Sequence, residues 1–239
     1  MNYKEIDIEG EQILKSMSKG IKLNHWMYSQ IKPYVTGKTL EIGSGIGNIS
    51  RYFIENGDEI YLSDIRDQYL KLLKSKFPDN EVIKIDLVDP DFDEKHSKLF
   101  ESFELVFALN VIEHIQDDKK ALINLSKLLK PNGFIYILVP AHQILFNNFD
   151  KTLFHYRRYN KRKLIDALPN AIKIKKSWYF NFAGIFGWFI VGKILNKKTI
   201  PESNMILYNL LTPLFKLLDY LTFNKLGLSV IVTGQKSSR

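Results

Sequence analysis

Cysteine is absent from the 239 residues of this chain. This absence excludes disulfide bonds, thiolate metal sites, iron–sulfur clusters and every mechanism that uses a cysteine nucleophile, including methylation of cytosine C5. It also fits a reducing compartment. Residues 1–22 lack an apolar core of the length found in signal peptides. We therefore expect a cytoplasmic protein.

Acidic side chains are scarce in the C-terminal third of the chain. Residues 1–150 hold 18 Lys and Arg against 23 Asp and Glu, whereas residues 151–239 hold 16 Lys and Arg against three acids, Asp166, Glu202 and Asp219. Such an asymmetry indicates an anionic partner for the last third, which could be a phosphate-bearing substrate, a nucleic acid or a lipid headgroup. The alternative is a basic surface that only increases solubility.

Apolar runs alternate with helical patterns through the middle of the chain. Strands are expected at 38–42, 59–63, 81–85, 105–109 and 134–139, and the helices between them at 46–56, 66–77 and 117–130. This alternation predicts βαβ units and a parallel sheet with helices on both faces. The carboxyl ends of the strands then meet at one edge of the sheet, where such folds bind ligands.

The flanking regions complete a single domain. Residues 1–37 are expected to form a helical flap with helices at 10–19 and 22–34, before a core over 38–140. Residues 141–239 are expected to hold a loop-like segment rich in His, Tyr and Arg, strands at 172–179 and 228–234, and two apolar helices at 182–195 and 204–223, split by the polar residues 196–204.

A glycine-rich turn follows the first expected strand. Gly43, Gly45 and Gly47 allow a sharp strand-to-helix turn and close approach of a ligand to the backbone. Asn48 stands where a dinucleotide-binding motif has glycine. Glu41, two residues before the first glycine, favours a cationic ligand because it repels a phosphate.

Two further acids end the next two strands. Asp64 stands where sheets of this kind accept hydrogen bonds from ribose hydroxyls, and Asp86 stands where a carboxylate can meet the amine of a base. Each acid alone is an ordinary solvated strand end. Together with the glycine turn, they indicate a nucleoside site.

With these features, residues 38–140 resemble a class I S-adenosylmethionine-dependent methyltransferase. The matching motifs are Glu41-Ile42-Gly43-Ser44-Gly45-Ile46-Gly47, Leu62-Ser63-Asp64-Ile65, Lys84-Ile85-Asp86-Leu87, Asn110-Val111-Ile112-Glu113-His114-Ile115 and Leu128-Leu129-Lys130-Pro131-Asn132-Gly133, with Asn132 where glycine is commonest. The resemblance implies a Rossmann-like α/β fold with seven mostly parallel strands and an antiparallel last strand.

The resemblance also implies the cofactor, S-adenosylmethionine, with S-adenosylhomocysteine as the product. The implied cofactor-binding residues are Glu41, Gly43, Ser44, Gly45, Gly47, Asp64, Ile65, Asp86, Leu87 and Asn110. In this assignment the turn at Gly43 and Gly45 holds the methionine end, together with Asn110. Asp64 binds the ribose, and Asp86 with Leu87 binds the adenine.

The catalytic candidates are Glu113, His114 and His155, because methylation of a hydroxyl benefits from a general base. A structural role for His114 is an equal alternative. Some quinone-directed relatives bind a metal through E-x-x-E-H at this point, but Asn110 replaces the first acid, so no metal is expected. The [DNS]-P-P-[YFW] motif of amino-group methylation of nucleic-acid bases is also missing, which argues against a nucleic-acid substrate.

The segment from His155 to Tyr159 is rich in basic and aromatic side chains. Tyr156, Arg157, Arg158 and Tyr159 are candidates for binding the acceptor, because paired guanidinium groups clamp anions and tyrosines stack on rings. The alternative is a basic segment that pairs with acids of the N-terminal part. The HYRRY string also resembles a bacterial methyltransferase subgroup associated with surface-polysaccharide and glycolipid pathways.

Residues 178–195 form an apolar stretch close to the shortest length of a membrane span. Three interpretations stay open: a helical lid over the acceptor site, an element that lies on the membrane surface, and a dimer or core contact. The flanking lysines suit an anionic bilayer surface, and they are Lys193, Lys197, Lys198, Lys216 and Lys225.

Taken together, the sequence predicts transfer of a methyl group to a hydroxyl, and with less support to an amine, of an anionic or lipid-linked small molecule such as a sugar intermediate. The expected location is cytoplasmic, with the inner face of the membrane as an alternative. Two other functions stay open: methylation of RNA, and binding of S-adenosylmethionine without catalysis by a protein that docks on membrane or a partner.

Overall fold

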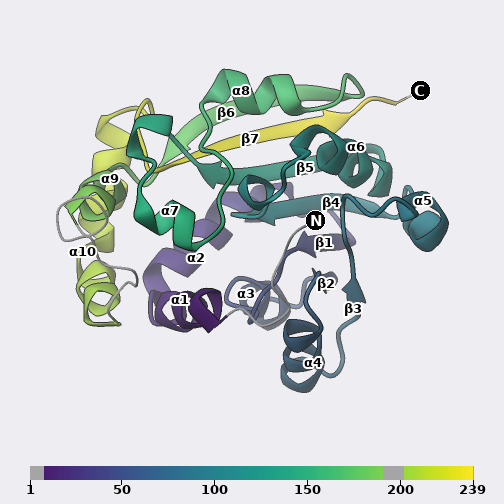
Figure 1. Cartoon of the computed structure of the whole chain (residues 1–239), viewed down its shortest axis with the longest axis horizontal. Coiled ribbons are helices and arrows are strands. Elements are labelled where there is room, and N and C mark those ends of the chain that lie inside the picture. Colours follow the sequence, from purple (N-terminus) through teal and green to yellow (C-terminus); the bar gives the residue numbers. More distant parts are fainter. Residues whose placement is uncertain (1–7, 191–201, 239) are drawn as a thin grey trace.

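A seven-stranded sheet forms the centre of the computed structural model, which describes residues 8–190 and 202–238 (Figure 1). The strands lie in the order β3-β2-β1-β4-β5-β7-β6. They are β1 (Thr39–Ile42), β2 (Ile60–Asp64), β3 (Val82–Lys84), β4 (Phe103–Leu109), β5 (Leu129–Pro140), β6 (Ile172–Phe180) and β7 (Ser229–Lys236). Only β7 runs antiparallel to its neighbours, β5 and β6. The expected Rossmann-like fold with an antiparallel last strand is therefore confirmed.

Helices cover both faces of the sheet. They are α1 (Ile8–Ser18), α2 (Ile21–Ile31), α3 (Ser50–Glu55), α4 (Asp67–Lys76), α5 (Phe92–His96), α6 (Asp118–Leu128), α7 (Asn148–Thr152), α8 (Lys161–Ala167), α9 (Phe182–Phe189) and α10 (Glu202–Leu221), with short 3₁₀ turns η1 (Lys32–Tyr34), η2 (Ser97–Leu99), η3 (Ile112–His114) and η4 (Gln143–Leu145). Side chains of α5, α6 and α8 pack in one apolar cluster. Those of α2, α3, α4 and α10 pack in another.

Strand β4 shows why the sheet lies between two layers of helices. Val106 and Ala108 belong to the first cluster, whereas Leu105 and Phe107 belong to the second. Successive side chains of a strand point to opposite faces, so a central strand covered by helices is apolar on both, as β4 is from Leu105 to Leu109. The phenyl ring of Phe107 stacks on Phe53 of α3, with ring centroids 5.1 Å apart.

Three local expectations were wrong. The helix expected at 46–56 begins only at Ser50, because the glycine turn continues through Gly47 in the left-handed region at φ 76°. Helix α5 was not expected, because five residues are too few to produce a helical periodicity. Strand β5 also begins earlier than expected, at Leu129, with an irregular register opposite β4 before Phe134.

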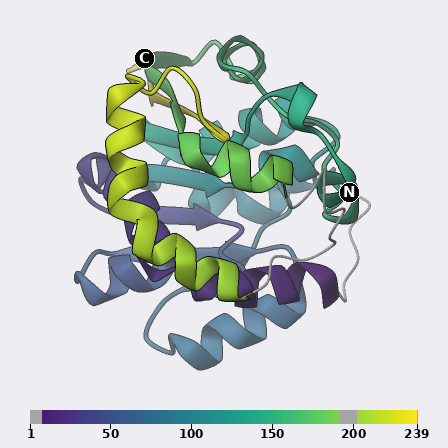
Figure 2. The same ribbon diagram turned by 90° about the vertical axis from the view of Figure 1, so that its left-hand side faces the viewer.

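Helices α9 and α10 lie at one end of the sheet, between β6 and β7 in the chain (Figure 2). Asn181 adopts the left-handed conformation, and its side chain caps α9 by accepting a hydrogen bond from the amide of Gly184. Among the described helices, none combines the length and the apolar character that crossing a bilayer requires. The polar break expected before Asn204 lies largely outside the described residues, as do Lys193, Lys197 and Lys198.

Asp219 of α10 holds the start of α9. Its two carboxylate oxygens accept hydrogen bonds from the amides of Asn181 at 2.7 Å and Phe182 at 2.6 Å. We expect Asp219→Ala to lower the free energy of unfolding by about 2–4 kcal/mol, because it leaves buried N–H groups without an acceptor. Urea denaturation measures this loss. Asp219→Asn keeps one acceptor oxygen and should lose less, whereas the exposed Asp166→Ala serves as the control. Equal stability of all three variants would contradict the role of Asp219.

Candidate functional site

A cavity of about 890 Å³ lies at the carboxyl edge of the sheet. Residues that follow β1, β2, β3 and β4 line it, together with side chains of α1, α2, α9 and α10. Nine of the ten cofactor-binding residues predicted from the sequence line this cavity: Glu41, Gly43, Ser44, Gly45, Asp64, Ile65, Asp86, Leu87 and Asn110. The tenth, Gly47, is the last glycine of the turn and is not among the residues that line the cavity. A Cβ atom there would lie 2.4 Å from the Phe77 ring.

The glycine turn begins where β1 ends. Gly43 has φ 73°, and a Cβ atom there would lie 2.5 Å from Cγ2 of Val111, so both conformation and space require glycine. The turn is tied to β2 by two hydrogen bonds: the amide of Ser44 donates to the carbonyl of Ser63 at 2.7 Å, and the amide of Ser63 donates to Oγ of Ser44 at 3.1 Å. The backbone of the turn is therefore fixed before any ligand arrives.

Glu41 lies buried beneath this turn. Burial raises the pKa of its carboxyl group to about 7, although hydrogen bonds from Ser50 and Ser44 act in the opposite direction. The hydroxyl of Ser50 donates to Oε2 of Glu41. A cation bound nearby favours the ionised carboxylate, so the site suits a positively charged ligand.

Asp64 ends β2 with its carboxylate turned toward the glycine turn. Oδ2 accepts a hydrogen bond from the amide of Gly45, and Oδ1 accepts one from the amide of Arg66, each at 3.0 Å. Burial raises the pKa of Asp64, and these two bonds oppose that shift. Each carboxylate oxygen has two lone pairs, so Asp64 retains capacity to accept from a ligand.

The ends of β3 and β4 provide the next wall of the cavity. Asp86 is half-buried, and its Oδ1 accepts from the amide of Val88 at 2.9 Å. The carbonyl of Leu87 accepts from Nδ2 of Asn124 at 2.9 Å. Asn110 is exposed at φ 54°, a left-handed conformation that asparagine tolerates better than most residues. These residues keep the edge open between the two strands.

Glu113 is fully buried in η3, directly after β4. Within the described parts of the chain, neither of its carboxylate oxygens has a hydrogen-bond partner. Burial raises the pKa of Glu113 to about 8, and the positive charge of Arg158 offsets only part of that shift. The side chain is therefore mostly protonated at neutral pH, and it lines the cavity.

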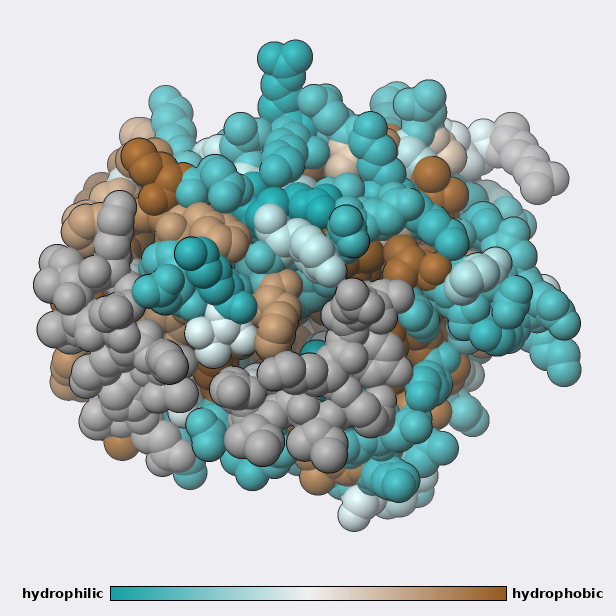
Figure 3. Space-filling model, in the orientation of Figure 1, coloured by the Kyte–Doolittle hydropathy of each residue, from teal (hydrophilic) through white to brown (hydrophobic). Residues whose placement is uncertain are grey.

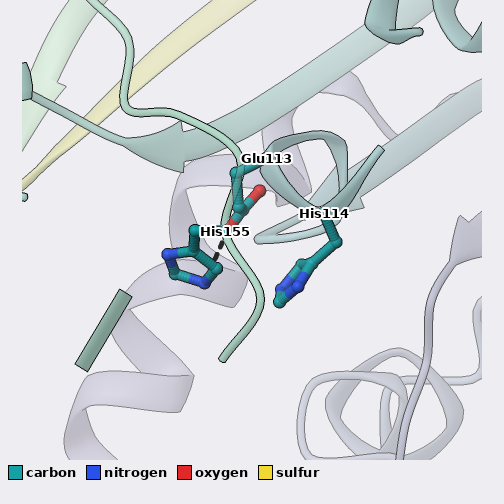
Figure 4. Close-up of side chains that lie close together, drawn as sticks. All are labelled: Glu113, His114 and His155. Atoms are coloured by element: carbon teal, nitrogen blue, oxygen red, sulfur yellow. Dashed lines mark ion pairs between the residues drawn. The ribbon is translucent and has the colours of Figure 1, made fainter. Parts of the chain in front are cut away.

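His155 lies next to Glu113, and the dashed line in Figure 4 marks the contact between the two side chains. Its Nδ1 lies 2.8 Å from Oδ1 of Asp150, and its Nε2 lies 4.0 Å from Oε1 of Glu113. Arg158 donates through Nε to the same oxygen of Asp150 at 2.8 Å. Burial acts to raise the pKa of Asp150, but the bonds from His155 and Arg158 outweigh it and the pKa is lowered. An ionised Asp150 then accepts from Nδ1–H of His155, which leaves Nε2 as a proton acceptor.

His114 packs edge to face against His155, with ring centroids 4.6 Å apart. Burial, together with the neighbouring His155, lowers the pKa of His114 to about 3, so the ring is neutral at physiological pH. Glu113, His114 and His155 offer ligand atoms that lie within 4.8 Å of one another, so this cluster could hold a metal ion. The absence of a metal stays a prediction.

The rest of the HYRRY segment points away from the cavity. Arg157 pairs with Asp118 at 2.8 Å and donates to the carbonyl of Gln116 at 2.6 Å. Tyr159 is buried and its hydroxyl donates to the same Asp118 at 2.7 Å, whereas Tyr156 is exposed. These contacts correspond to the alternative in which the segment pairs with acids of the N-terminal part. Acceptor binding by these three residues stays a prediction without support from their positions.

Sequence reasoning missed two members of the site. Asp150 was not assigned a role, and its only signal is the spacing of Asn147 and Asp150, which form a capping box at the start of α7. The indole ring of Trp188 lies 4.6 Å from the guanidinium of Arg158 and lines the cavity. The contact of Trp188 arises from packing between segments that are distant in sequence, whereas Asp150 contacts residues five and eight positions further along the chain.

Comparison with known proteins supports this geometry. A model of the methyltransferase domain family matches residues 40–135. In sequence, 122 residues are 25% identical to a highly reducing polyketide synthase of Pyrenophora dematioidea, a match that covers 47% of this chain but only 5% of that protein. The chain therefore spans a small part of this curated relative.

Solved structures show the same fold. A SAM-dependent methyltransferase from Archaeoglobus fulgidus is 16% identical, with a TM-score of 0.54, over 89% of this chain and 94% of that one. Phosphoethanolamine N-methyltransferase 2 of Haemonchus contortus in complex with S-adenosyl-L-methionine is 19% identical, with a TM-score of 0.59, over 91% of this chain and 53% of that one. The same Haemonchus enzyme, bound to phosphomonomethylethanolamine and S-adenosylhomocysteine, also matches, at 18% identity and a TM-score of 0.59 over the same shares of the two chains.

The family match falls on strands that build the cavity, since β1, β2, β3 and β4 lie within the matched residues. Residues 40–135 therefore match the methyltransferase domain family, and the fold of the chain is that of solved S-adenosylmethionine-dependent methyltransferases.

Proposed function

We propose that this protein is an S-adenosylmethionine-dependent methyltransferase that acts on a hydroxyl group of a lipid-linked acceptor, such as a sugar intermediate carried on a lipid. One observation carries the proposal: a single cavity joins the glycine turn at Gly43, the imidazole of His155 and a wall of apolar side chains from α9 and α10. An acceptor with a polar head and an apolar tail fits such a lining.

The polar end of the cavity supports the assignment of the cofactor residues. S-adenosylmethionine supplies, when bound, an electrophilic methyl group on a sulfonium. In our proposal the free lone pairs of Asp64 accept from the ribose hydroxyls, and the turn at Gly43 and Gly45 holds the methionine end with Glu41 beneath it. Asp86 and Leu87 face the adenine. The protein then has to align the acceptor oxygen and exclude water.

His155 is the residue that we assign as the general base. His155 lines the cavity with its Nε2 4.0 Å from Oε1 of Glu113, and in our proposal Asp150 stabilises the imidazolium that forms when the acceptor hydroxyl gives up its proton. Arg158 keeps Asp150 ionised. His114 is a poor base, because a group with a pKa of about 3 holds a proton only weakly. We therefore assign His114 a packing role against His155.

Glu113 complements this base. Since its pKa of about 8 leaves it protonated at neutral pH, its O–H can donate a hydrogen bond to a lone pair of the acceptor oxygen. Such a donor, close to a histidine that accepts, orients a hydroxyl group. An amine acceptor, as the name of the Haemonchus enzyme indicates for that protein, is the second candidate.

An acceptor panel tests the proposal. We expect methyl transfer from labelled S-adenosylmethionine to a polyprenyl-linked sugar, with kcat/KM at least about 100-fold above that of the same sugar without its lipid, because each buried CH₂ contributes about 0.8 kcal/mol. Phosphoethanolamine and an RNA oligonucleotide complete the panel. Turnover of either of these alone would replace our proposal, and binding of the cofactor without turnover of any acceptor would favour a non-catalytic protein.

Substitution of the base should separate catalysis from binding. We expect His155→Gln and Asp150→Asn to lower kcat by about 10²–10⁴-fold, with little change in the Kd for S-adenosylhomocysteine measured by calorimetry. Added imidazole should restore part of the activity of His155→Gln. The exposed His25→Gln is the matched control. Full activity of His155→Gln, or a parallel loss of cofactor binding, would remove His155 from the role of base.

Glu113 should make the stability of the protein depend on pH. Between its ordinary pKa of 4.5 and about 8, the unfolded chain has lost this proton and the folded chain has kept it, so stability falls as pH rises. Glu113→Gln has no proton to lose. We therefore expect the wild type to lose unfolding free energy relative to this variant as pH rises from about 5 to 7.5. Urea titrations at each pH measure the difference. The exposed Glu55→Gln should show no such trend, and a pH-independent difference for Glu113→Gln would show that the group is ionised.

A further inference from the structure

Helices α9 and α10 leave a large apolar surface uncovered. Leu210, Tyr220 and Phe223 are 71%, 75% and 78% exposed. The exposed apolar residues of this surface, which we call the α9–α10 surface, are Phe186, Phe189, Ile190, Ile206, Leu207, Leu210, Leu214, Leu217, Tyr220, Leu221, Phe223 and Leu226. Figure 3 shows hydrophobic side chains gathered at the end of the molecule where Figure 1 places these two helices.

The residue pattern of α10 differs from that of an ordinary surface helix, which has one face packed on the core and a polar face toward water. Its inner face is formed by Met205, Thr212 and Asp219, which are buried. Its outer face repeats apolar residues at helical spacing, as Ile206, Leu210, Leu214, Leu217 and Leu221, where a surface helix carries polar residues. An apolar patch of this kind marks an interaction surface.

The α9–α10 surface is continuous with the cavity. Phe186, Ile190 and Leu207 are exposed, and all three also line the cavity that contains Gly43 and His155. A lipid chain that contacts this surface can therefore pass into the cavity along apolar side chains. No layer of polar side chains has to be crossed at these three positions.

The charged side chains around the α9–α10 surface indicate what kind of partner binds there. Lys216 and Lys225 are exposed on and just after α10. Asn209 of α10 bonds to the carbonyl of Lys19 and the amide of Lys22, which places two further exposed lysines beside the helix. From Met205 to the end of α10, Asp219 is the one acidic residue, and it is buried and bonded to the amides of Asn181 and Phe182. The rim of the apolar surface is therefore cationic.

We propose that the α9–α10 surface docks on an anionic lipid bilayer and that the lipid-linked acceptor enters the cavity from the bilayer beside Phe186, Ile190 and Leu207. Apolar side chains reach the interface between headgroups and acyl chains, and each lysine gains about 1 kcal/mol from anionic headgroups. The docking is inferred from the α9–α10 surface alone, whereas the entry route of the acceptor rests on the proposed function. A second copy fits less well, because a two-fold contact opposes two cationic rims.

Vesicle sedimentation with the full-length protein tests the docking. We expect the protein to sediment with vesicles of phosphatidylglycerol and phosphatidylcholine, and to bind pure phosphatidylcholine vesicles far more weakly. Binding should fall as salt is raised. Absence of binding to the anionic vesicles at low salt would overturn the docking.

Two pairs of variants separate the apolar and the charged contributions. Leu210→Gln with Tyr220→Gln should weaken binding by about tenfold or more, and Lys216→Gln with Lys225→Gln by about fivefold for each lysine. Ile123→Gln and Lys74→Gln are matched exposed controls on α6 and α4. Thermal unfolding checks that each variant is folded. Equal vesicle binding by all variants would overturn the assignment of this surface.

The acceptor assay separates this inference from the proposed function. The Leu210 and Tyr220 variant should keep its activity on acceptor dispersed in detergent and lose it on acceptor embedded in vesicles. Loss of both activities would contradict a surface that acts only in docking. Turnover in detergent without any vesicle binding by the wild type would keep the proposed function and reject the docking. A dimer in analytical ultracentrifugation that the same variant dissociates would assign the surface to a second copy.

Discussion

Parallel pairing of β1, β2, β3 and β4 is the constraint on which the rest of the molecule depends. It brings the ends of strands that are far apart in sequence to one edge, so that Glu41, Asp64 and Glu113 line the same cavity. Any one of these carboxyl groups would be an ordinary polar residue on an isolated strand. The antiparallel β7 then returns the chain to the sheet and leaves α9 and α10 at that same end.

Burial gives neighbouring ionisable groups different protonation states. Glu113 stays protonated and His114 stays neutral, because the interior penalises a charge on either, whereas Asp150 stays ionised because His155 and Arg158 donate to it. His155 thus has the ionised carboxylate of Asp150 at one ring nitrogen and the protonated carboxyl group of Glu113 near the other, and it lines the cavity. The division of roles follows from the surroundings of each group and not from its residue type.

The sequence was sufficient for the fold and for the polar end of the cavity, because strand periodicity and glycine spacing are local signals. Arg157 and Arg158 show where such signals end: adjacent in sequence, they pair with Asp118 on one side and Asp150 on the other, since successive side chains of an extended segment point in opposite directions. Pairing with Asp150 also depends on the turn of α7. The apolar pattern of α10 likewise predicts a helix without indicating which face stays uncovered.

Residues 181–228 leave the sheet and return to it at a single point. Phe180 at the end of β6 pairs with Ser229 at the start of β7, and the amide of Leu228 donates to the carbonyl of Asn181 at 3.0 Å. These contacts hold the two ends of the excursion together without any residue between 182 and 227. We therefore expect a change in the length of this excursion to leave the glycine turn and its strands in place.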